Sequence, residues 1–105
     1  MAASEGVTTD RVSFHPAALE EADAAAAWYA ERSESTPERF LEEVDWAIER
    51  IASNPQAYAR FEGDSRRILL PHFPYQIIFR HRSNVVEILA VAHTRRRPSY
   101  WRKRT

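Results

Sequence analysis

A chain of 105 residues with 44% hydrophobic and 11% aromatic residues is long enough to form one domain with its own core. It contains no cysteine, which excludes disulfides and thiolate metal sites and favours a reducing compartment. No apolar run approaches the roughly 18 residues that cross a bilayer, and residues 1–10 lack the pattern of a signal peptide. We therefore expect a cytoplasmic protein that makes no contact with a membrane.

The net charge of zero conceals a strong asymmetry along the chain. Residues 1–65 carry 5 arginines and 14 acidic residues, which gives a net charge of −9. Residues 66–105 carry 9 arginines, Lys103 and a single acidic residue, Glu87, which gives +9. This division favours an anionic partner for one face of the molecule, or two halves that attract each other within the fold.

The N-terminal part of the chain predicts an arm and then a strand. Residues 1–10 are expected to form a flexible arm, and residues 11–105 a single domain. Val12 and Phe14 alternate with polar residues in the sequence RVSFH, and this alternation predicts a short strand over 11–15.

Two helices are expected to follow this strand and to form an antiparallel pair. Pro16 suits a first helical turn, because the amide hydrogen that proline lacks has no helical partner there. The first helix is predicted over 17–32, with a buried stripe of Leu19, Ala22, Ala26 and Tyr29. Ser35 and Glu38 have the spacing of a capping box at the start of the second helix. That helix is predicted to end near Ser53 and to bury Phe40, Leu41, Val44, Ala47, Ile48 and Ile51.

After residue 65 the hydrophobic pattern changes to the period of a strand. Three runs rich in Ile, Leu, Val and aromatic residues predict strands over 66–70, 75–80 and 85–92. The resulting order is β-α-α-β-β-β. It predicts an α+β fold in which a helical hairpin packs on one face of a small, mainly antiparallel sheet.

The turns between these strands predict a register that divides the sheet into two faces. Leu70 is expected opposite Tyr75, and Arg80 opposite Val85. The face under the helices would then carry Ile68, Leu70, Tyr75, Ile77, Phe79, Val86, Ile88 and Ala90. The other face would carry Arg67, Leu69, Gln76, Ile78, Arg80, Glu87, Leu89, Val91 and His93.

The second of these faces is half apolar and half charged, and we expect no later segment to cover it. We interpret it as a surface that binds a partner. The alternative is a solvated sheet on which Arg67 and Arg80 pair with Glu87 across the strands.

The last predicted strand runs directly into the cationic and aromatic sequence HTRRRPSYWRKR. Its three consecutive arginines could neutralise phosphates, and Tyr100 or Trp101 could stack on a base or anchor the C-terminal turn. His93 could act as acid or base in RNA cleavage, with Tyr100 and an arginine completing the set. Alternatively, His93 is a hydrogen-bonded structural residue at the end of a strand.

Other chemistries find no support in the sequence. The two glycines, Gly6 and Gly63, cannot build a phosphate-binding loop. The four histidines lack the spacing of metal ligands, so we expect no metal and no cofactor. Trp28 and Trp46 lie at the edge of their helix stripes or off them, where they suit a protein contact or local packing.

The element order, together with the sequences AAAAWYAERS, RRILLPHFPYQIIFR and AVAHTRRRPSYW, resembles the RelE/ParE superfamily of type II toxin–antitoxin toxins. The resemblance covers roughly residues 11–104 and is strongest to the ParE-like branch. It implies a growth-inhibiting toxin, of the kind linked to plasmid stabilization, that a cognate antitoxin protein neutralises. The antitoxin's C-terminal segment would drape over the toxin while its N-terminal domain binds operator DNA. Operator DNA would thus be reached only through the antitoxin.

The same resemblance implies two alternative targets. RelE-like toxins cut mRNA in the ribosome with a catalytic set of lysine and arginine residues together with tyrosine, or with histidine and glutamate. ParE-like toxins poison DNA gyrase and carry no such set. The sequence NPQAYARFEGDS has no lysine where RelE-like members place theirs, which favours the gyrase-binding, non-enzymatic interpretation. The alternative is a ribosome-dependent mRNA endoribonuclease with the candidate catalytic residues Arg67, Arg80, His93 and Tyr100. A third hypothesis is a toxin fold that binds only its antitoxin.

Two groups of binding residues complete these expectations. Residues expected to bind the target are Arg95, Arg96, Arg97, Tyr100 and Trp101. Residues expected to bind the antitoxin are Arg67, Leu69, Ile78, Arg80, Leu89 and Val91.

Overall fold

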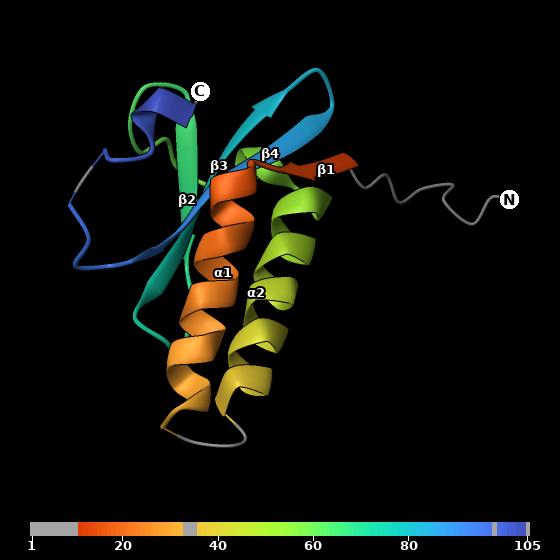
Figure 1. Cartoon of the computed structure of the whole chain (residues 1–105). Coiled ribbons are helices and arrows are strands. Elements are labelled where there is room, and N and C mark those ends of the chain that lie inside the picture. The colour runs from red at the N-terminus through yellow and green to blue at the C-terminus, as the bar shows by residue number, and fades with distance from the viewer. Residues whose placement is uncertain (1–10, 33–35, 98, 105) are drawn as a thin grey trace, which may run out of the picture.

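The computed structural model describes residues 11–32, 36–97 and 99–104, and its elements follow the predicted order (Figure 1). The expected arm at 1–10 and the cap at Ser35 lie outside the described residues. The helices and strands are β1 (Arg11–Phe14), α1 (Pro16–Ala30), α2 (Thr36–Ser53), β2 (Ser65–Leu69), β3 (Tyr75–Arg82) and β4 (Val85–His93). Short 3-10 helices follow at Pro55–Ala57 and Arg102–Arg104.

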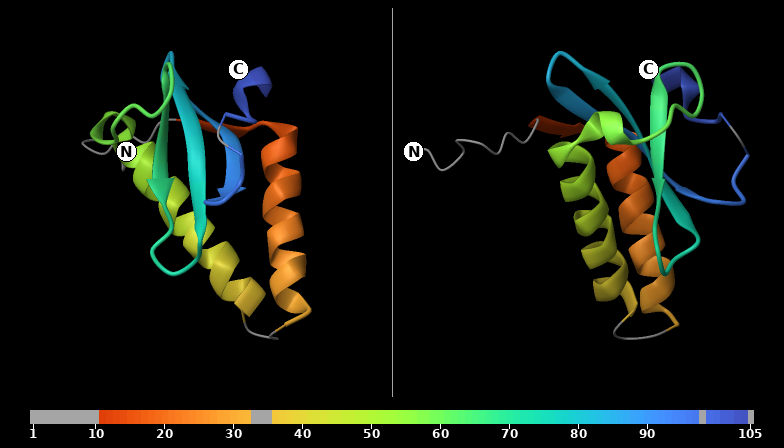
Figure 2. Two further views of the ribbon diagram at one scale, coloured as in Figure 1. Left: turned by 90° about the vertical axis from the view of Figure 1, so that its left-hand side faces the viewer. Right: turned by 180° about the vertical axis from the view of Figure 1, so that it is seen from behind.

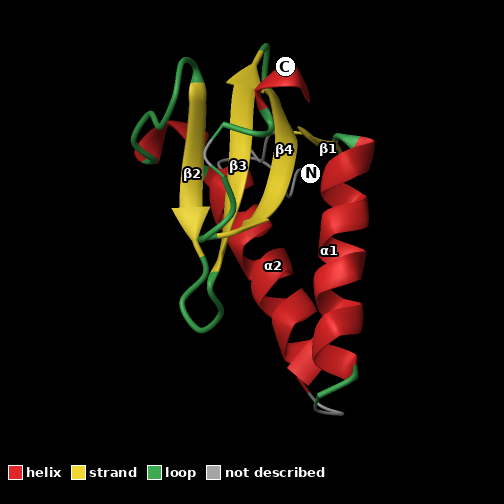
Figure 3. Ribbon diagram, turned by 60° about the vertical axis from the view of Figure 1, so that its left-hand side comes forward, coloured by secondary structure: helices red, strands yellow, loops and turns green. Residues whose placement is uncertain are grey.

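The strands form one layer and the two helices lie side by side on one of its faces (Figures 2 and 3). The strand order is β1-β4-β3-β2, with β1 parallel to β4 and the other neighbours antiparallel. This arrangement confirms the predicted α+β fold class. Within the described residues, neither helix is long and apolar enough to cross a membrane.

Small residues let α1 approach the sheet closely. Ala18, Ala22 and Ala25 are buried on its inner side, and His15 caps its N-terminus by accepting the Ala17 amide hydrogen at 3.1 Å. Leu19 was predicted to be buried, but it is half exposed. The residue before it, Ala18, is buried in its place. In α2 the predicted residues are buried except for Leu41, which is exposed, and Ile48, which is partly buried.

The turn between β3 and β4 is tighter than the sequence suggests. Ser83 and Asn84 both have positive φ angles, of 51° and 64°, as a two-residue hairpin turn requires. Arg82 therefore lies opposite Val85, and the predicted pairing of Arg80 with Val85 was wrong. The predicted β2–β3 register is confirmed, since Leu69 pairs with Gln76.

A bulge in β4 changes which residues face the helices. Ile78 pairs with Ala90 and Phe79 pairs with Ile88, so Leu89 is an extra residue in β4. Because side chains alternate along a strand, one extra residue exchanges the two faces for everything after it. Ala90 therefore packs with Ile78 on the outer face, and Val91 packs in the helix-facing core. Both had been predicted on the opposite face.

The outer face of the sheet is covered by the chain's own C-terminal residues 99–104, so the expectation of an uncovered face was wrong. Trp101 is only 2% exposed and stacks on Phe61, with ring centroids 5.5 Å apart. Together they bury Ile78 and Leu89 completely. Leu69, beyond this cover, is 53% exposed.

This cover predicts a marked loss of stability on replacing Trp101 with alanine. Removing a large buried aromatic side chain typically costs about 3–5 kcal/mol, because it leaves a cavity and loses contacts. Urea unfolding measured by circular dichroism should show this loss for Trp101→Ala. Lys103→Ala, an exposed change in the same segment, should stay within about 0.5 kcal/mol of the wild type. Equal stabilities of the two variants would contradict the buried position of Trp101.

Candidate functional site

The Glu21 carboxylate on α1 holds the C-terminal residues against β4. Arg104 donates two hydrogen bonds to it, at 3.0 and 2.9 Å, and the Tyr100 hydroxyl donates a third at 2.8 Å. Glu21 also accepts the Val91 amide hydrogen at 2.9 Å, while Arg104 donates to the Leu89 carbonyl at 2.8 Å. The Glu21 and Arg104 side chains are each only 16% exposed. We call this set of contacts the Glu21 clasp.

The clasp also changes the acidity of Tyr100. Burial raises the pKa of its phenol, and the hydrogen bond donated to Glu21 raises it further, because both disfavour the phenolate. The same carboxylate raises the pKa of Arg104. At neutral pH, Tyr100 therefore keeps its proton and directs it at Glu21, which makes it a poor proton donor to a substrate.

A small pocket on the outer face gathers several arginines and rings. It has a volume of about 150 Å³, and we call it the arginine pocket. Its lining consists of Phe61, Arg67, Gln76, Ala92, Thr94, Arg96, Arg97, Tyr100 and Trp101. Arg67 is held there by a hydrogen bond to the Gln76 side-chain oxygen at 3.0 Å and by the Phe61 ring, whose centroid lies 4.2 Å from the guanidinium carbon.

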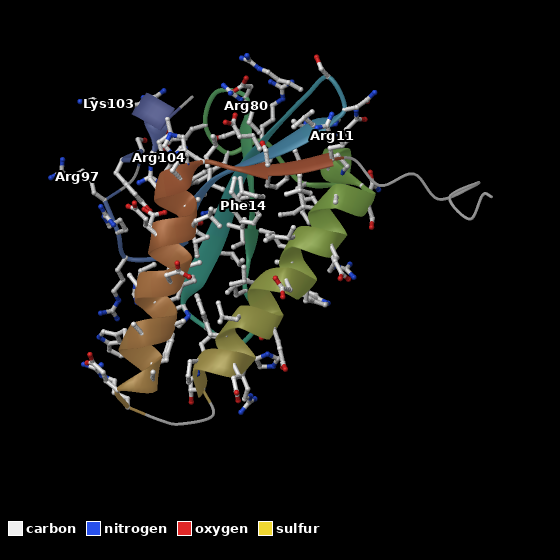
Figure 4. The ribbon with its side chains drawn as sticks, turned by 45° about the vertical axis from the view of Figure 1, so that its right-hand side comes forward. Arg11, Phe14, Arg80, Arg97, Lys103 and Arg104 are labelled. Carbon is white, nitrogen blue, oxygen red and sulfur yellow. The ribbon has the colours of Figure 1, made fainter. Side chains whose placement is uncertain are left out.

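Arg96 is fixed in a similar way and belongs to two hollows. Its guanidinium carbon lies 3.9 Å from the centroid of the Tyr100 ring, a cation–π contact worth about 0.5–1 kcal/mol at exposed sites. Arg96 also lines a second, larger hollow of about 350 Å³ between α1 and β4, which we call the helix–strand groove. Figure 4 shows Arg97 projecting away from the body of the molecule and Arg104 lying beside α1.

The arginines of this region differ in whether a carboxylate pairs with them. Arg102 pairs with Glu62 at 3.6 Å and Arg104 with Glu21. Among the described residues, no carboxylate forms an ion pair with the exposed Arg95, Arg96 or Arg97. These three cations are thus available to an anionic partner.

His93 lies on the helix side of the sheet and not with the arginine pocket. Its Nδ1 accepts the Arg95 amide hydrogen at 3.0 Å, and its ring meets Tyr75 edge-on with centroids 5.1 Å apart. It lines the groove between α1 and β4. This hydrogen bond ties the ring to the main chain of the turn that follows β4.

The candidate catalytic residues are therefore only partly brought together. Arg67 and Tyr100 share the arginine pocket, whereas His93 lines the other hollow. Arg80 forms an ion pair with Glu87, its cross-strand neighbour, at 2.5 Å. The pairing of Arg80 with Glu87 was foreseen as the alternative for this face, but Arg67 does not share it.

The structure also separates the expected binding residues into exposed and buried ones. Arg67 and Leu69 are exposed, Arg80 is partly buried, and Ile78, Leu89 and Val91 have buried side chains. Of the residues expected to bind the target, Arg95, Arg96 and Arg97 are exposed, whereas Trp101 is buried and packs within the protein.

Sequence reasoning missed three residues that shape the site. Glu21 is not part of the buried stripe predicted for its helix, and its role depends on a contact with Arg104, 83 positions away. Phe61 stacks on Trp101, 40 positions further along the chain, and no local pattern in the sequence predicts this contact. Glu62 accepts a hydrogen bond from the Ser99 hydroxyl. The only signal in the sequence was the opposite charge of the two halves.

Among the described residues, no group of three or more histidine, aspartate or glutamate side chains could hold a metal ion.

Comparison with solved structures identifies the class of fold. The chain superimposes with a TM-score of 0.68 on a chain of the chromosomal ParDE toxin–antitoxin system from P. aeruginosa, at 18% identity, covering 81% of this chain and 96% of that one. It superimposes with a TM-score of 0.64 on an arginine-to-alanine double mutant of the E. coli toxin RelE in the free state, at 17% identity, covering 91% and 97%. The protein thus has the RelE/ParE toxin fold.

The family follows from the sequence itself. Residues 12–98 match the model of the ParE toxin of the type II toxin–antitoxin system parDE. The chain therefore belongs to the ParE toxin family, as the resemblance had implied. No curated protein matches the sequence.

The Glu21 clasp predicts that Glu21→Gln destabilises the fold. The change keeps the shape but leaves the guanidinium of Arg104 without its charge partner, at a cost on the order of 3 kcal/mol. Glu20→Gln is the matched control, because Glu20 is exposed and adjacent in sequence. The midpoint of chemical unfolding should be lower for Glu21→Gln than for the wild type, and unchanged for Glu20→Gln. Equal midpoints for both variants would argue against the clasp.

The raised pKa of Tyr100 predicts a loss of stability in alkali. Below the ordinary tyrosine pKa of about 10, both the folded and the unfolded state keep the proton. Above it the unfolded chain releases the proton while folded Tyr100 retains it, so stability falls as pH rises. Tyr100→Phe should show a smaller fall between mildly and strongly alkaline buffers. Parallel pH profiles of unfolding for the two proteins would contradict the raised pKa.

Proposed function

We propose that this protein is a growth-inhibiting toxin that acts by binding DNA gyrase and that a cognate antitoxin holds inactive. Membership of the ParE family supports the toxin and antitoxin parts of this proposal. Gyrase works in the cytoplasm, so the toxin is proposed to act there. The choice of gyrase rests on the exposed residues Arg95, Arg96 and Arg97, which have no carboxylate partner among the described residues. The described residues of the site also do not bring a candidate acid and base together.

The positions of the candidate catalytic residues support a binding toxin over an enzyme. Cleavage of RNA through the ribose 2′-OH needs a base, an acid and a cation close to one phosphate. Here His93 and Arg67 line different hollows, and the Tyr100 hydroxyl is engaged in a hydrogen bond to Glu21. A surface that offers arginines without these proton carriers suits binding better than catalysis.

One observation favours the alternative, a ribosome-dependent mRNA endoribonuclease of the RelE type. Arg67, Arg96 and Arg97 surround a single pocket, and such a cluster could stabilise the charge on a phosphate in transit. The similarity of the fold to the E. coli toxin RelE is consistent with this alternative.

Antitoxin binding at the outer sheet face remains part of the proposal, in a more limited form. Arg67 and Leu69 are exposed and available to a partner. Ile78 and Leu89 lie beneath residues 99–104, so a partner would touch them only after displacing this cover. Operator DNA would be contacted by the antitoxin and not by this chain.

Induced expression in a bacterial host tests the target directly. Early DNA breaks, before any change in mRNA, would support gyrase, and mRNA cuts at defined codon positions would support the endoribonuclease. Normal growth despite folded protein would support the third hypothesis, a toxin fold that binds only its antitoxin. Co-expression with the product of the neighbouring antitoxin gene should restore growth in either of the first two cases.

The gyrase proposal predicts different effects for two sets of substitutions. His93→Gln should keep most of the toxicity, since glutamine can still accept the Arg95 amide hydrogen but cannot transfer protons near neutral pH. Replacing Arg95, Arg96 and Arg97 together with alanine should abolish toxicity, because the local positive field is lost. Growth inhibition and melting curves of both variants provide the measurement.

A ribonuclease would give the opposite result for the first variant. If His93 were its acid or base, His93→Gln would lose on the order of 10²–10⁴ in cleavage rate. Loss of toxicity in a normally folded His93→Gln protein would therefore overturn the preferred proposal.

A further inference from the structure

The helix–strand groove is a hollow large enough for a small molecule. It lies between α1 and β4, which run side by side in Figure 3. Its volume of about 350 Å³ falls in the lower part of the range that is typical of ligand sites. Its lining comes from α1, from the start of β3, and from the end of β4 with the turn that follows. The fold thus brings three segments that are distant in the sequence to one concave surface.

One wall of the groove is apolar. Ala24, Ala25 and Trp28 contribute this wall from α1. Trp28 is large and apolar but 50% exposed, and Arg32 covers one face of its ring. This wall suits a flat apolar group, which would pack on the small alanines and contact the indole ring.

Several polar side chains of the groove are hydrogen-bond donors without an acceptor. Tyr29 and Tyr75 both line it and are partly buried, with ring centroids 6.3 Å apart. Neither hydroxyl forms a hydrogen bond within the described residues. Burial raises the pKa of both phenols, so both keep their hydrogens at neutral pH and can donate them. Arg96 is a donor of fixed charge, and no described carboxylate pairs with it.

The side-chain acceptors of the groove are already engaged. Glu21, the carboxylate among the described lining residues, accepts four hydrogen bonds, two from Arg104 and one each from Tyr100 and Val91. Four is about the capacity of a carboxylate. A ligand that uses the free donors must therefore bring its own acceptors. Because one of these donors is a cation, a negatively charged acceptor is favoured.

The shape of the groove separates this ligand from a phosphate. The arginine pocket gathers Arg67, Arg96 and Arg97 around about 150 Å³, which suits a small anion of high charge. The groove is more than twice as large, and the described residues that line it include a single arginine beside an apolar wall. An anion of low charge with an apolar body is the better match for such a site.

We propose that the helix–strand groove binds a small aromatic carboxylate. Its carboxylate accepts hydrogen bonds from Arg96 and from the Tyr29 or Tyr75 hydroxyl. Its ring packs against Ala24 and Trp28. A carboxylate suits these donors because it accepts several hydrogen bonds at once and matches the planar guanidinium. The proposal goes beyond the proposed function and does not depend on it, since it concerns binding to the isolated protein.

Titration of the full-length protein with indole-3-carboxylate, followed by two-dimensional amide NMR, tests the site. The main-chain signals of Ala24 and Arg96 and the indole N–H signal of Trp28 should shift in a saturable manner at millimolar concentrations of the probe. Indole-3-carboxamide, which has nearly the same shape without the charge, should bind on the order of tenfold more weakly. Inorganic phosphate is the control for unspecific attraction of anions, and it should leave the signals of Ala24 and Trp28 unchanged.

Two pairs of substitutions locate the bound probe. Ala24 and Ala27 are both exposed on α1, but only Ala24 lines the groove, so Ala24→Phe fills it and Ala27→Phe makes the same change outside it. Arg96→Gln removes the cation of the groove, and Arg50→Gln removes one exposed positive charge on α2, outside the groove. Ala24→Phe and Arg96→Gln should each weaken binding of indole-3-carboxylate on the order of tenfold, whereas the two controls should bind it as the wild type does. Melting curves confirm that all four variants are folded.

Three results would overturn the proposal. The first is the absence of a saturable shift at Ala24, Arg96 and Trp28. The second is equal affinity for the carboxylate and the carboxamide, because the site would then be an apolar hollow without selectivity for an anion. The third is an equal effect of Ala24→Phe and Ala27→Phe, which would place the probe elsewhere on the molecule. Binding is measured without target or antitoxin, so each of these results leaves the proposed function standing, and a failure to inhibit growth leaves the ligand site standing.

Discussion

One extra residue in β4, Leu89, determines the side of the sheet on which every later residue of that strand lies. Without this bulge, Ala90 would face the helices and His93 would face the arginine pocket. With it, Val91 enters the core beneath α1 and His93 faces the groove along that helix. The bulge also turns the Leu89 carbonyl toward Arg104, so the strand irregularity provides an anchor for the C-terminal residues. The location of the histidine relative to the arginines is thus a consequence of strand geometry.

Three arginines of the basic half of the chain pair with carboxylates of the acidic half. Arg104, Arg102 and Arg82 come from the basic half, and they pair with Glu21, Glu62 and Asp64 of the acidic half. The partly buried Glu21 pair is the one expected to contribute most, since exposed ion pairs are screened by water and salt. Such pairing brings residues 99–104 onto the sheet, where Trp101 completes a second small core. Within the described residues the three arginines at 95–97 stand apart from this pairing, which separates cations that hold the fold from cations free for a partner.

Local patterns in the sequence were sufficient to predict most of the fold. Hydrophobic period and turn residues located both helices, all four strands and the β2–β3 register, because these depend on neighbours in sequence. The bulge at Leu89 leaves no comparable trace, since LAVAH reads as a regular strand. The clasp between Glu21 and Arg104 joins distant positions and follows only from the folded chain. For the candidate site, the exposed Arg95, Arg96 and Arg97 could be predicted from the sequence, but the side on which His93 lies and the burial of Trp101 could not.

Arg96 links the two hollows of the molecule. Its side chain lies over Tyr100 at the arginine pocket, and the same residue lines the helix–strand groove. Both hollows therefore share one cation, so an anionic group bound in either of them would neutralise a charge that the proposed target surface requires. Tyr100 would keep its hydrogen bond to Glu21 and its second cation–π contact, with Arg104 at 5.0 Å, so the C-terminal cover would stay in place. The cation available to a partner is therefore separate from the contacts of Glu21 that hold the C-terminal residues on the sheet.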